Sequence, residues 1–325
     1  MLKVFSYIAL TVALTLFLMS GFWFYFGPGV LQSHAALSPI PDFLMVSKNN
    51  QVRLLDLWSP VVEKMQIHEG DLAEMTAQSV LMYDLTTDKV LYEKEAKVRR
   101  PMASITKIMT AIIAIENRRL DDKYLVRHED IVGEDSMGVR AGEVYSFQDL
   151  LYGLMLPSGN DAAEVLAHNY PSGRDGFIKA MNNKAESLGL VDTHFTNPSG
   201  LQGDGEQYTT TYDLLVITRY ALEHYPIFAH TVATSTFDIA ESNEHGALTL
   251  VNETNLLTTY PGVKGVKTGY TPEAGMCLVT YLDYGGHKII GIMLNSENRR
   301  GEMKELLDYS LKSLSIEPPP FEEEQ

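Results

Sequence analysis

The chain has 325 residues, 45% of them hydrophobic, which is enough for one large domain with appendages. Its formal charge of -16 argues against a nucleic-acid partner, because phosphate binding requires clustered Lys and Arg. The single cysteine, Cys277, cannot form an intramolecular disulfide, and it has no matched His and Asp partners to suggest a metal site. We therefore expect no metal and no organic cofactor.

Residues 1–34 differ in kind from the rest of the chain. No charged side chain occurs between Lys3 and His34, and residues 4–26 form an apolar run of about 23 residues, which is long enough to cross a bilayer. The aromatic cluster at 22–26 suits a membrane interface. The segment is predicted to be a transmembrane anchor. A cleaved signal peptide stays open as an alternative, because small residues flank His34. Either reading places the rest of the chain outside the cytoplasmic membrane.

The rest of the chain divides into three parts. Residues 35–75 contain scattered prolines and charges without a sustained period, which predicts a linker or stalk. Residues 76–312 carry the patterned segments of one folded domain. Residues 313–325 form an acidic tail, which we expect to be disordered from Phe321 onward.

Hydrophobic periodicity within the domain predicts strands at both ends and helices between them. A hairpin is predicted over 77–93, and strands over 263–268, 275–284 and 288–295. Helices are predicted over 104–117, 147–156, from 161 onward, and over 176–188, 211–224 and 302–311. This order predicts an α+β fold with an antiparallel sheet, to which both ends of the domain contribute, flanked by helices and joined by a helical subdomain.

Ser104 and Lys107 stand three residues apart at the start of a buried helix, so they share one helix face. Serine is a weak nucleophile until a base takes its proton, and a lysine desolvated by apolar neighbours can be neutral enough to act as that base. Taken alone, this short motif occurs by chance in many proteins and is more typical of an N-cap serine followed by an exposed lysine.

Two further short elements are ambiguous when each is taken alone. Ser158 and Asn160 flank Gly159 between two predicted helices, where they could project into a cleft or simply cap a helix. Lys267, Thr268 and Gly269 follow a predicted strand. Their cation and hydroxyl could bind a substrate carboxylate, although the segment could also be a strand ending in a turn.

All three elements occur in the order and contexts of the signature of penicillin-interacting serine enzymes. Their flanks, residues 103–110, 154–163 and 265–275, closely resemble low-molecular-mass penicillin-binding proteins that are D-alanyl-D-alanine carboxypeptidases. The resemblance covers about residues 77–311. It implies the serine β-lactamase and D,D-peptidase type of fold, and a serine carboxypeptidase that trims peptidoglycan stem peptides ending in D-Ala-D-Ala and is acylated by β-lactams.

The resemblance also implies roles for single residues. Ser104 would be the acylated nucleophile and Lys107 its base. Ser158 and Asn160 would move a proton and hold the substrate amide. The terminal carboxylate would be bound by Lys267, Thr268 and Arg299, with neighbouring Arg300 as the alternative to Arg299. Gly269 belongs to the same substrate-binding element, and the backbone N–H groups of Ser104 and Tyr270 would form the oxyanion hole.

The sequence departs from the family pattern at Ser199, where relatives commonly have a His, so a role for that position is in doubt. No Glu-x-x-Leu-Asn segment lies between Asn160 and Lys267, which disfavours a β-lactamase. A D,D-endopeptidase acting on cross-links and a non-catalytic penicillin-binding scaffold remain alternatives. The expected location is the outer face of the bacterial cytoplasmic membrane, or the exterior if the N-terminal segment is cleaved.

Overall fold

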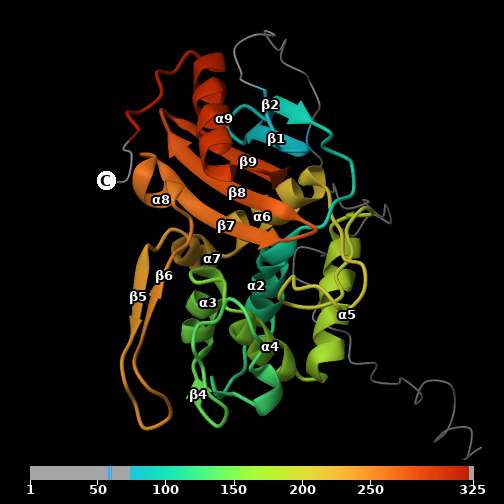
Figure 1. Cartoon of the computed structure of the whole chain (residues 1–325), viewed down its shortest axis with the longest axis vertical. Helices are drawn as coiled ribbons and strands as arrows, with labels where there is room; N and C mark the ends of the chain where they lie inside the picture. The colour runs from blue at the N-terminus through green and yellow to red at the C-terminus, as the bar shows by residue number, and fades with distance from the viewer. Residues whose placement is uncertain (1–57, 59, 61–73, 322–325) are drawn as a thin grey trace, which may run out of the picture. The chain divides into compact units, whose positions relative to one another are not determined.

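The computed structural model describes Trp58, Pro60 and residues 74–321 (Figure 1). Its centre is a five-stranded antiparallel sheet in the order β2-β1-β9-β8-β7. The strands are β1 (Ser79–Asp84), β2 (Lys89–Lys94), β7 (Val263–Thr271), β8 (Gly275–Tyr284) and β9 (His287–Ser296). The first strand of the domain pairs with the last, so both ends of the domain share one sheet, as predicted.

The sheet is buried on both faces. Along β1, Val80 and Met82 pack into the apolar cluster that includes α9 (Arg299–Ser313), whereas Leu81 and Tyr83 pack into the larger cluster of the helices. This alternation follows from the two-residue side-chain period of a strand. Figure 1 shows α9 on one face of the sheet and α6 (Thr211–His224) on the other.

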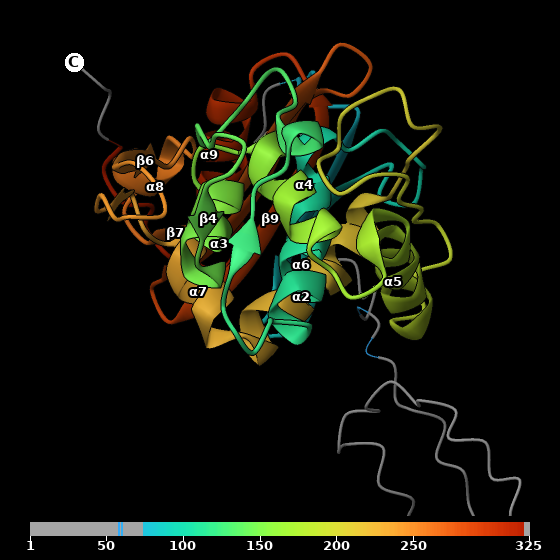
Figure 2. The same ribbon diagram turned by 90° about the horizontal axis from the view of Figure 1, so that it is seen from below.

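Five other helices form a subdomain below the sheet in the view of Figure 1, and Figure 2 shows them from that side. They are α2 (Lys107–Glu116), α3 (Phe147–Met155), α4 (Asn160–His168), α5 (Gly173–Ser187) and α7 (Pro226–Val232). α2 is the central helix, because it packs against α3, α4, α5 and α6. The predicted α+β fold with a helical subdomain is confirmed.

Local sequence signals explain where several elements begin and turn. The hydroxyls of Ser146 and Thr210 accept the backbone N–H groups of Asp149 and Asp213, and so cap α3 and α6. The β8–β9 hairpin turns at Gly285 and Gly286, whose φ angles of 61° and 84° favour glycine. These signals are local, which is why the main boundaries agree with prediction to within a few residues.

Several short elements were not predicted from the sequence. They are β3 (Tyr124–Leu125), β4 (Val144–Tyr145), β5 (Thr236–Ile239), β6 (Leu248–Val251), α8 (Leu256–Thr259), the 3-10 turn η3 (His128–Asp130) and the seven-residue helix α7. The 3-10 turn η2 (Ala103–Thr106) forms the start of the helix predicted over 104–117. Elements of two to four residues are too short to show a hydrophobic period. The pair β5–β6 forms a separate two-stranded sheet with mostly exposed or half-exposed residues, so it lacks a clear apolar pattern.

The predicted anchor over 1–34 lies outside the described residues, as does most of the predicted linker. Within the linker, Trp58 packs edge-on against Tyr83 with ring centroids 5.6 Å apart. At the other end, Phe321 packs against Tyr260, although the acidic tail was expected to be disordered from that residue; 322–325 lie outside the described residues. Among residues 58, 60 and 74–321, no helix has the length and apolar character needed to cross a membrane.

Candidate active site

Ser104 and Lys107 meet at the junction between η2 and α2. Ser104 lies in the 3-10 turn, where residues three apart are eclipsed, and Lys107 begins the α-helix. The Nζ atom of Lys107 lies 2.8 Å from the Oγ atom of Ser104, and the lysine side chain is fully buried. The preceding residue, Ala103, has a φ of 48°, so the backbone adopts a strained left-handed conformation beside the serine.

The other partners of Lys107 show how its amine can act as a base. Nζ donates to Oδ1 of Asn160 at 2.7 Å and to the backbone carbonyl of Ser199 at 2.8 Å. Both partners can only accept a hydrogen bond, and a neutral amine has two N–H donors and one lone pair. The two N–H groups are therefore used by the carbonyls. The lone pair remains for the hydroxyl proton of Ser104.

The electrostatic environment favours this neutral form. Burial in the protein interior lowers the pKa of Lys107 well below its usual value, and the nearby charge of Lys267 lowers it further. Asp135, Glu253 and Asp161 act in the opposite direction, with smaller effects. An uncharged amine at this position is consistent with general-base chemistry near neutral pH.

The second element is a rigid turn between α3 and α4. Ser158 is buried and has a φ of 62°, a left-handed conformation that a serine adopts only when its surroundings enforce it. The backbone N–H groups of Gly159 and Asn160 donate to the carbonyls of Gly153 and Asp135, at 2.9 and 2.8 Å. The turn thereby fixes Asn160, whose side-chain oxygen holds the Lys107 amine.

The third element is strand β7, which lies at the edge of the sheet and passes next to Ser104. A Cβ atom at Gly269 would lie 3.0 Å from the backbone nitrogen of Ser104, so a larger residue would push the strand away from the nucleophile. Lys267 and Thr268 are buried, whereas 61% of the Tyr270 side chain is exposed. The three sequence elements therefore meet around Ser104, as predicted.

Positive charge gathers beside this strand. Burial lowers the pKa of Lys267 to about 8, with the charge of Arg299 adding to the effect and Glu253 opposing it. Arg299 donates from Nη1 to the carbonyl of Gly269 at 3.0 Å. Burial lowers the pKa of Arg299 from its very high usual value, and a guanidinium remains protonated at neutral pH.

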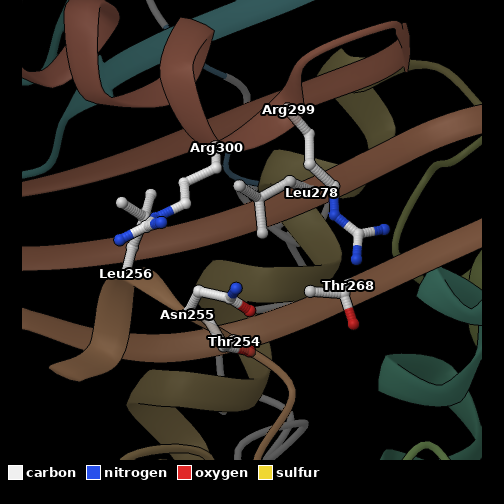
Figure 3. A pocket seen from close by; sticks show the side chains of 7 residues that line it. All are labelled: Thr254, Asn255, Leu256, Thr268, Leu278, Arg299 and Arg300. Carbon is white, nitrogen blue, oxygen red and sulfur yellow. The ribbon is translucent and has the colours of Figure 1, made fainter. Parts of the chain in front are cut away.

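The two candidate arginines, Arg299 and Arg300, point in different directions (Figure 3). Arg299, Thr268 and Arg300 line a small cavity of about 60 Å³ together with Leu278 and residues 254–256. The guanidinium of Arg299 points toward Thr268, whereas that of Arg300 points toward Leu256. The Arg300 guanidinium lies 5.4 Å from the ring of Phe321. Arg299 is thus the arginine placed beside β7.

A loop over 197–201 completes the site, and sequence reasoning missed its contribution. It supplies the Ser199 carbonyl to Lys107, and the hydroxyl of Thr110 donates to the Pro198 carbonyl at 2.6 Å. A Cβ at Gly200, whose φ is 92°, would lie 2.0 Å from the carbonyl oxygen of Ala103. The Asn-Pro-Ser-Gly sequence signals a turn. It does not reveal that a backbone carbonyl of the turn holds the base.

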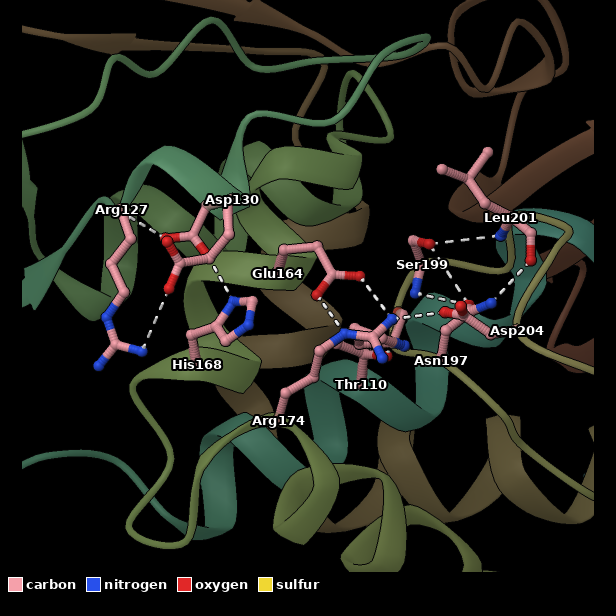
Figure 4. Close-up of polar contacts among 12 residues, drawn as sticks. Thr110, Arg127, Asp130, Glu164, His168, Arg174, Asn197, Ser199, Leu201 and Asp204 are labelled. Carbon is pink, nitrogen blue, oxygen red and sulfur yellow. Dashed lines mark hydrogen bonds and ion pairs between the residues drawn. The ribbon is translucent and has the colours of Figure 1, made fainter.

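Figure 4 shows how this loop is braced. The side chain of Asn197 accepts the backbone N–H of Gly200 at 2.7 Å and donates to the carbonyl of Leu201 at 2.7 Å. Arg174 on α5 pairs with Glu164 on α4 and with Asp204 in the segment that follows the loop. The side-chain hydroxyl of Ser199 makes only weak contacts, at 3.3 Å, with Asn197 and Leu201.

No metal-binding arrangement accompanies these groups in the part of the chain that the structure describes, where no three His, Cys, Asp or Glu residues form a cluster suited to an ion. Cys277 is buried beneath the β7 edge, and burial raises the pKa of its thiol to about 11. Its protonated thiol is a poor nucleophile. Ser104, whose Oγ lies 2.8 Å from the Lys107 amine, is therefore the better candidate for a nucleophile.

A buried serine–lysine pair, an Asn-bearing turn between helices and a cationic edge strand together define the class of penicillin-interacting serine hydrolases. Residues 64–298 match the family described as D-alanyl-D-alanine carboxypeptidase, and the chain belongs to that family.

Individual relatives agree with the family match. The chain is 32% identical to D-alanyl-D-alanine carboxypeptidase DacF of Bacillus subtilis, over 74% of this chain and 64% of the relative. It is 37% identical to a D-alanyl-D-alanine endopeptidase of Escherichia coli, over 63% of this chain and 67% of that protein. The crystal structure of the Streptomyces K15 DD-transpeptidase superposes with a TM-score of 0.69 at 33% identity, covering 74% of this chain and 98% of that one. The chain thus spans about two thirds of the length of these two curated relatives.

Proposed function

We propose that this protein is a serine-type D-Ala-D-Ala carboxypeptidase that removes the terminal D-Ala from peptidoglycan stem peptides. The observation that carries the proposal is the position of the buried Lys107 Nζ, which lies 2.8 Å from Oγ of Ser104 and within hydrogen-bonding distance of two carbonyl oxygens. In the neutral amine the two N–H groups are taken by the carbonyls, which leaves the lone pair for the hydroxyl proton of Ser104. The family match and the named relatives support the substrate class.

In the proposed reaction, Lys107 takes the hydroxyl proton of Ser104, and Oγ attacks the carbonyl carbon of the penultimate D-Ala. The backbone N–H groups of Ser104 and Tyr270 stabilise the oxyanion. The peptide C–N bond then breaks, and Ser158 relays the proton held by Lys107 to the departing amine of the terminal D-Ala, so that Lys107 is neutral again. Water hydrolyses the resulting acyl-enzyme and restores Ser104.

Substrate recognition would use the edge of the sheet. β7 is an edge strand that can align a peptide, and Gly269 allows the strand to lie close to the nucleophile. Lys267, Thr268 and Arg299 would bind the terminal carboxylate through charge-assisted hydrogen bonds. Oδ1 of Asn160 accepts a hydrogen bond from Lys107. The side-chain NH₂ group of Asn160 is therefore the part that can donate to a carbonyl of the substrate.

We extend the proposal to cellular location. The apolar run over 4–26 would hold the protein at the outer face of the cytoplasmic membrane, where peptidoglycan is accessible. Secretion after cleavage near residue 35 is the alternative. Fractionation of cells, with mass determination of the N-terminus of the recovered protein, distinguishes a retained anchor from a cleaved signal.

The decisive test is mass spectrometry of purified muropeptides before and after incubation with the protein. A carboxypeptidase removes one D-Ala from pentapeptide stems, whereas an endopeptidase splits cross-linked dimers. A fluorescent penicillin provides a second test, since covalent labelling should disappear in Ser104→Ala. Absence of labelling in the wild type, together with unchanged muropeptides, would support a non-catalytic scaffold instead.

A further inference from the structure

Glu253 lies between the second and third elements of the active site, and the reaction described above gives it no role. Its backbone N–H donates to the carbonyl of Leu156 at 3.2 Å, two residues before Ser158. Its side-chain Oε2 accepts a long and weak hydrogen bond from the hydroxyl of Thr268 at 3.4 Å. The carboxylate of Glu253 therefore contacts the same hydroxyl that would bind the carboxylate of a substrate.

The charges around Glu253 come from four parts of the chain. Lys267 on β7, Arg299 on α9 and Lys107 on α2 attract its carboxylate, and Asp135, in the segment before β4, repels it. Burial has the largest effect and raises the pKa of Glu253 above its usual value, and the charge of Asp135 adds to this rise. The carboxylate of Glu253 thus lies among the basic side chains of the site, where the carboxylate of a substrate would also bind.

We propose that Glu253 determines specificity by weakening the binding of substrates that have a free terminal carboxylate. Its own carboxylate competes with that of the substrate for Thr268 and Lys267. This inference rests on the proposed function, because it requires that these two residues bind the substrate. Two carboxylates a few ångströms apart repel each other, and this repulsion opposes the binding of a substrate carboxylate beside an ionised Glu253. A substrate with a free carboxylate must therefore displace Glu253 or bind when Glu253 is protonated.

The opposite role makes the opposite prediction. If Glu253 instead supported substrate binding by keeping Lys267 protonated, its neutralisation would lower the pKa of Lys267 and weaken the binding of a carboxylate. In the competing role, neutralisation strengthens that binding. The sign of the change in affinity therefore separates the two roles.

The test measures binding without turnover, in full-length protein carrying Ser104→Ala. The ligand is an N-acylated tripeptide ending in D-Ala-D-Ala, and its Kd is measured by calorimetry between pH 5 and 8. With Glu253→Gln added, we expect the Kd at pH 7.5 to fall roughly threefold to tenfold. The difference should shrink toward pH 5, because Glu253 becomes protonated in the parent as the pH falls toward its raised pKa.

Two matched variants control for charge and size. Glu241→Gln makes the same change in net charge at an exposed residue in the β5–β6 loop and should leave the Kd unchanged. Glu253→Asp keeps a carboxylate and should keep the pH dependence of the parent. Thermal unfolding checks that each variant folds.

An unchanged or higher Kd in Glu253→Gln, in a folded protein, would overturn the role of Glu253 alone. Failure of wild-type protein to hydrolyse the tripeptide, with no saturable binding by Ser104→Ala, would overturn the proposed function and this inference with it. The two failures are distinguishable, because the first leaves hydrolysis by the wild type intact.

Discussion

Lys107 and Arg174 are two basic residues in the helical part of the protein. The side chain of each one contacts three oxygen atoms within hydrogen-bonding distance. Lys107 contacts the hydroxyl of Ser104 and the carbonyl oxygens of Asn160 and Ser199. Arg174 contacts both carboxylate oxygens of Glu164 and one of Asp204, at 2.6 to 3.1 Å. The number of hydrogen bonds is the same, but the partners of Lys107 are uncharged and those of Arg174 are anions.

The surroundings shift the pKa values of the two groups in opposite directions. Hydrogen bonds and charge from Glu164 and Asp204 raise the pKa of Arg174, whose guanidinium is protonated at neutral pH in any case. Burial and the charge of Lys267 lower the pKa of Lys107 and favour its neutral form. The first arrangement stabilises structure by pairing opposite charges. The second leaves a lone pair available for chemistry, at a cost in stability, because burying an amine without a carboxylate partner is unfavourable.

The largest effect is expected when the amine of Lys107, with its lone pair, is removed. In Lys107→Ala, we expect the rate of acylation by a fluorescent penicillin to fall roughly 10²- to 10⁴-fold, because Ser104 loses its general base. The measurement is the time course of covalent labelling in gels. A variant that labels within tenfold of the wild-type rate would refute the assignment of Lys107 as the base.

The second test concerns the other buried lysine, Lys267. In Lys267→Ala, KM for a tripeptide ending in D-Ala-D-Ala should rise roughly tenfold to a hundredfold, because a hydrogen bond to a charged group contributes about 1.5 to 3 kcal/mol. Lys267 is cationic below its pKa of about 8, so carboxylate binding should weaken as the pH rises through that value. Lys107 must be neutral, so acylation should weaken as the pH falls through its lowered pKa.

These two limits predict a bell-shaped dependence of kcat/KM on pH in the wild type. The control is Lys267→Arg, whose guanidinium stays protonated throughout. Loss of the alkaline limb in this variant, with the acidic limb retained, would assign the limb to Lys267. An alkaline limb at the same pH in Lys267→Arg would contradict that assignment.

The side chains that we propose carry out the reaction were singled out from the sequence. Ser104, Lys107, Asn160 and Lys267 stand in short motifs whose spacing and residue types indicate their chemistry, and the structure brings these motifs together. The sheet was also predictable, because β8 and β9 are apolar runs bounded by glycine turns.

The parts of the site that act through the backbone, and the carboxylate of Glu253, could not be found in this way. The Ser199 carbonyl holds Lys107, and any residue at that position has a carbonyl. The left-handed backbone at Ala103 is imposed by packing, since neither alanine nor its neighbours favour it. Glu253 belongs to no motif, and only the path of the chain places it beside Thr268.

A third test concerns the ion pair between Arg174 and Glu164. In Arg174→Met, we expect the free energy of unfolding to fall by about 1 to 3 kcal/mol, because Glu164 is left buried without its cation; the value is below that of a fully buried pair because Arg174 is partly exposed. Urea unfolding measures this change. Acylation of the folded variant should stay within a few-fold of the wild-type rate, since Arg174 touches no reacting group.

Glu164→Gln in the Arg174→Met background serves as the matched control. If the uncompensated carboxylate causes the loss, the second substitution should recover part of the stability. A large fall in the acylation rate with an unchanged free energy of unfolding would instead show that Arg174 takes part in catalysis. Its role would then no longer be purely structural, in contrast to what we propose here.

The smallest effect is expected at Ser199, where the family commonly has a histidine. In Ser199→Ala, the carbonyl that holds Lys107 remains, and the only losses are the hydroxyl contacts of 3.3 Å to Asn197 and Leu201. Hydrogen bonds of this length are weak, so the rate of penicillin acylation should change by less than roughly threefold and the free energy of unfolding by less than about 1 kcal/mol. Labelling kinetics and urea unfolding measure both. A tenfold loss of rate in a stable variant would show that the hydroxyl itself takes part in proton transfer, and Lys107 would then no longer be surrounded only by fixed carbonyls and its nucleophile.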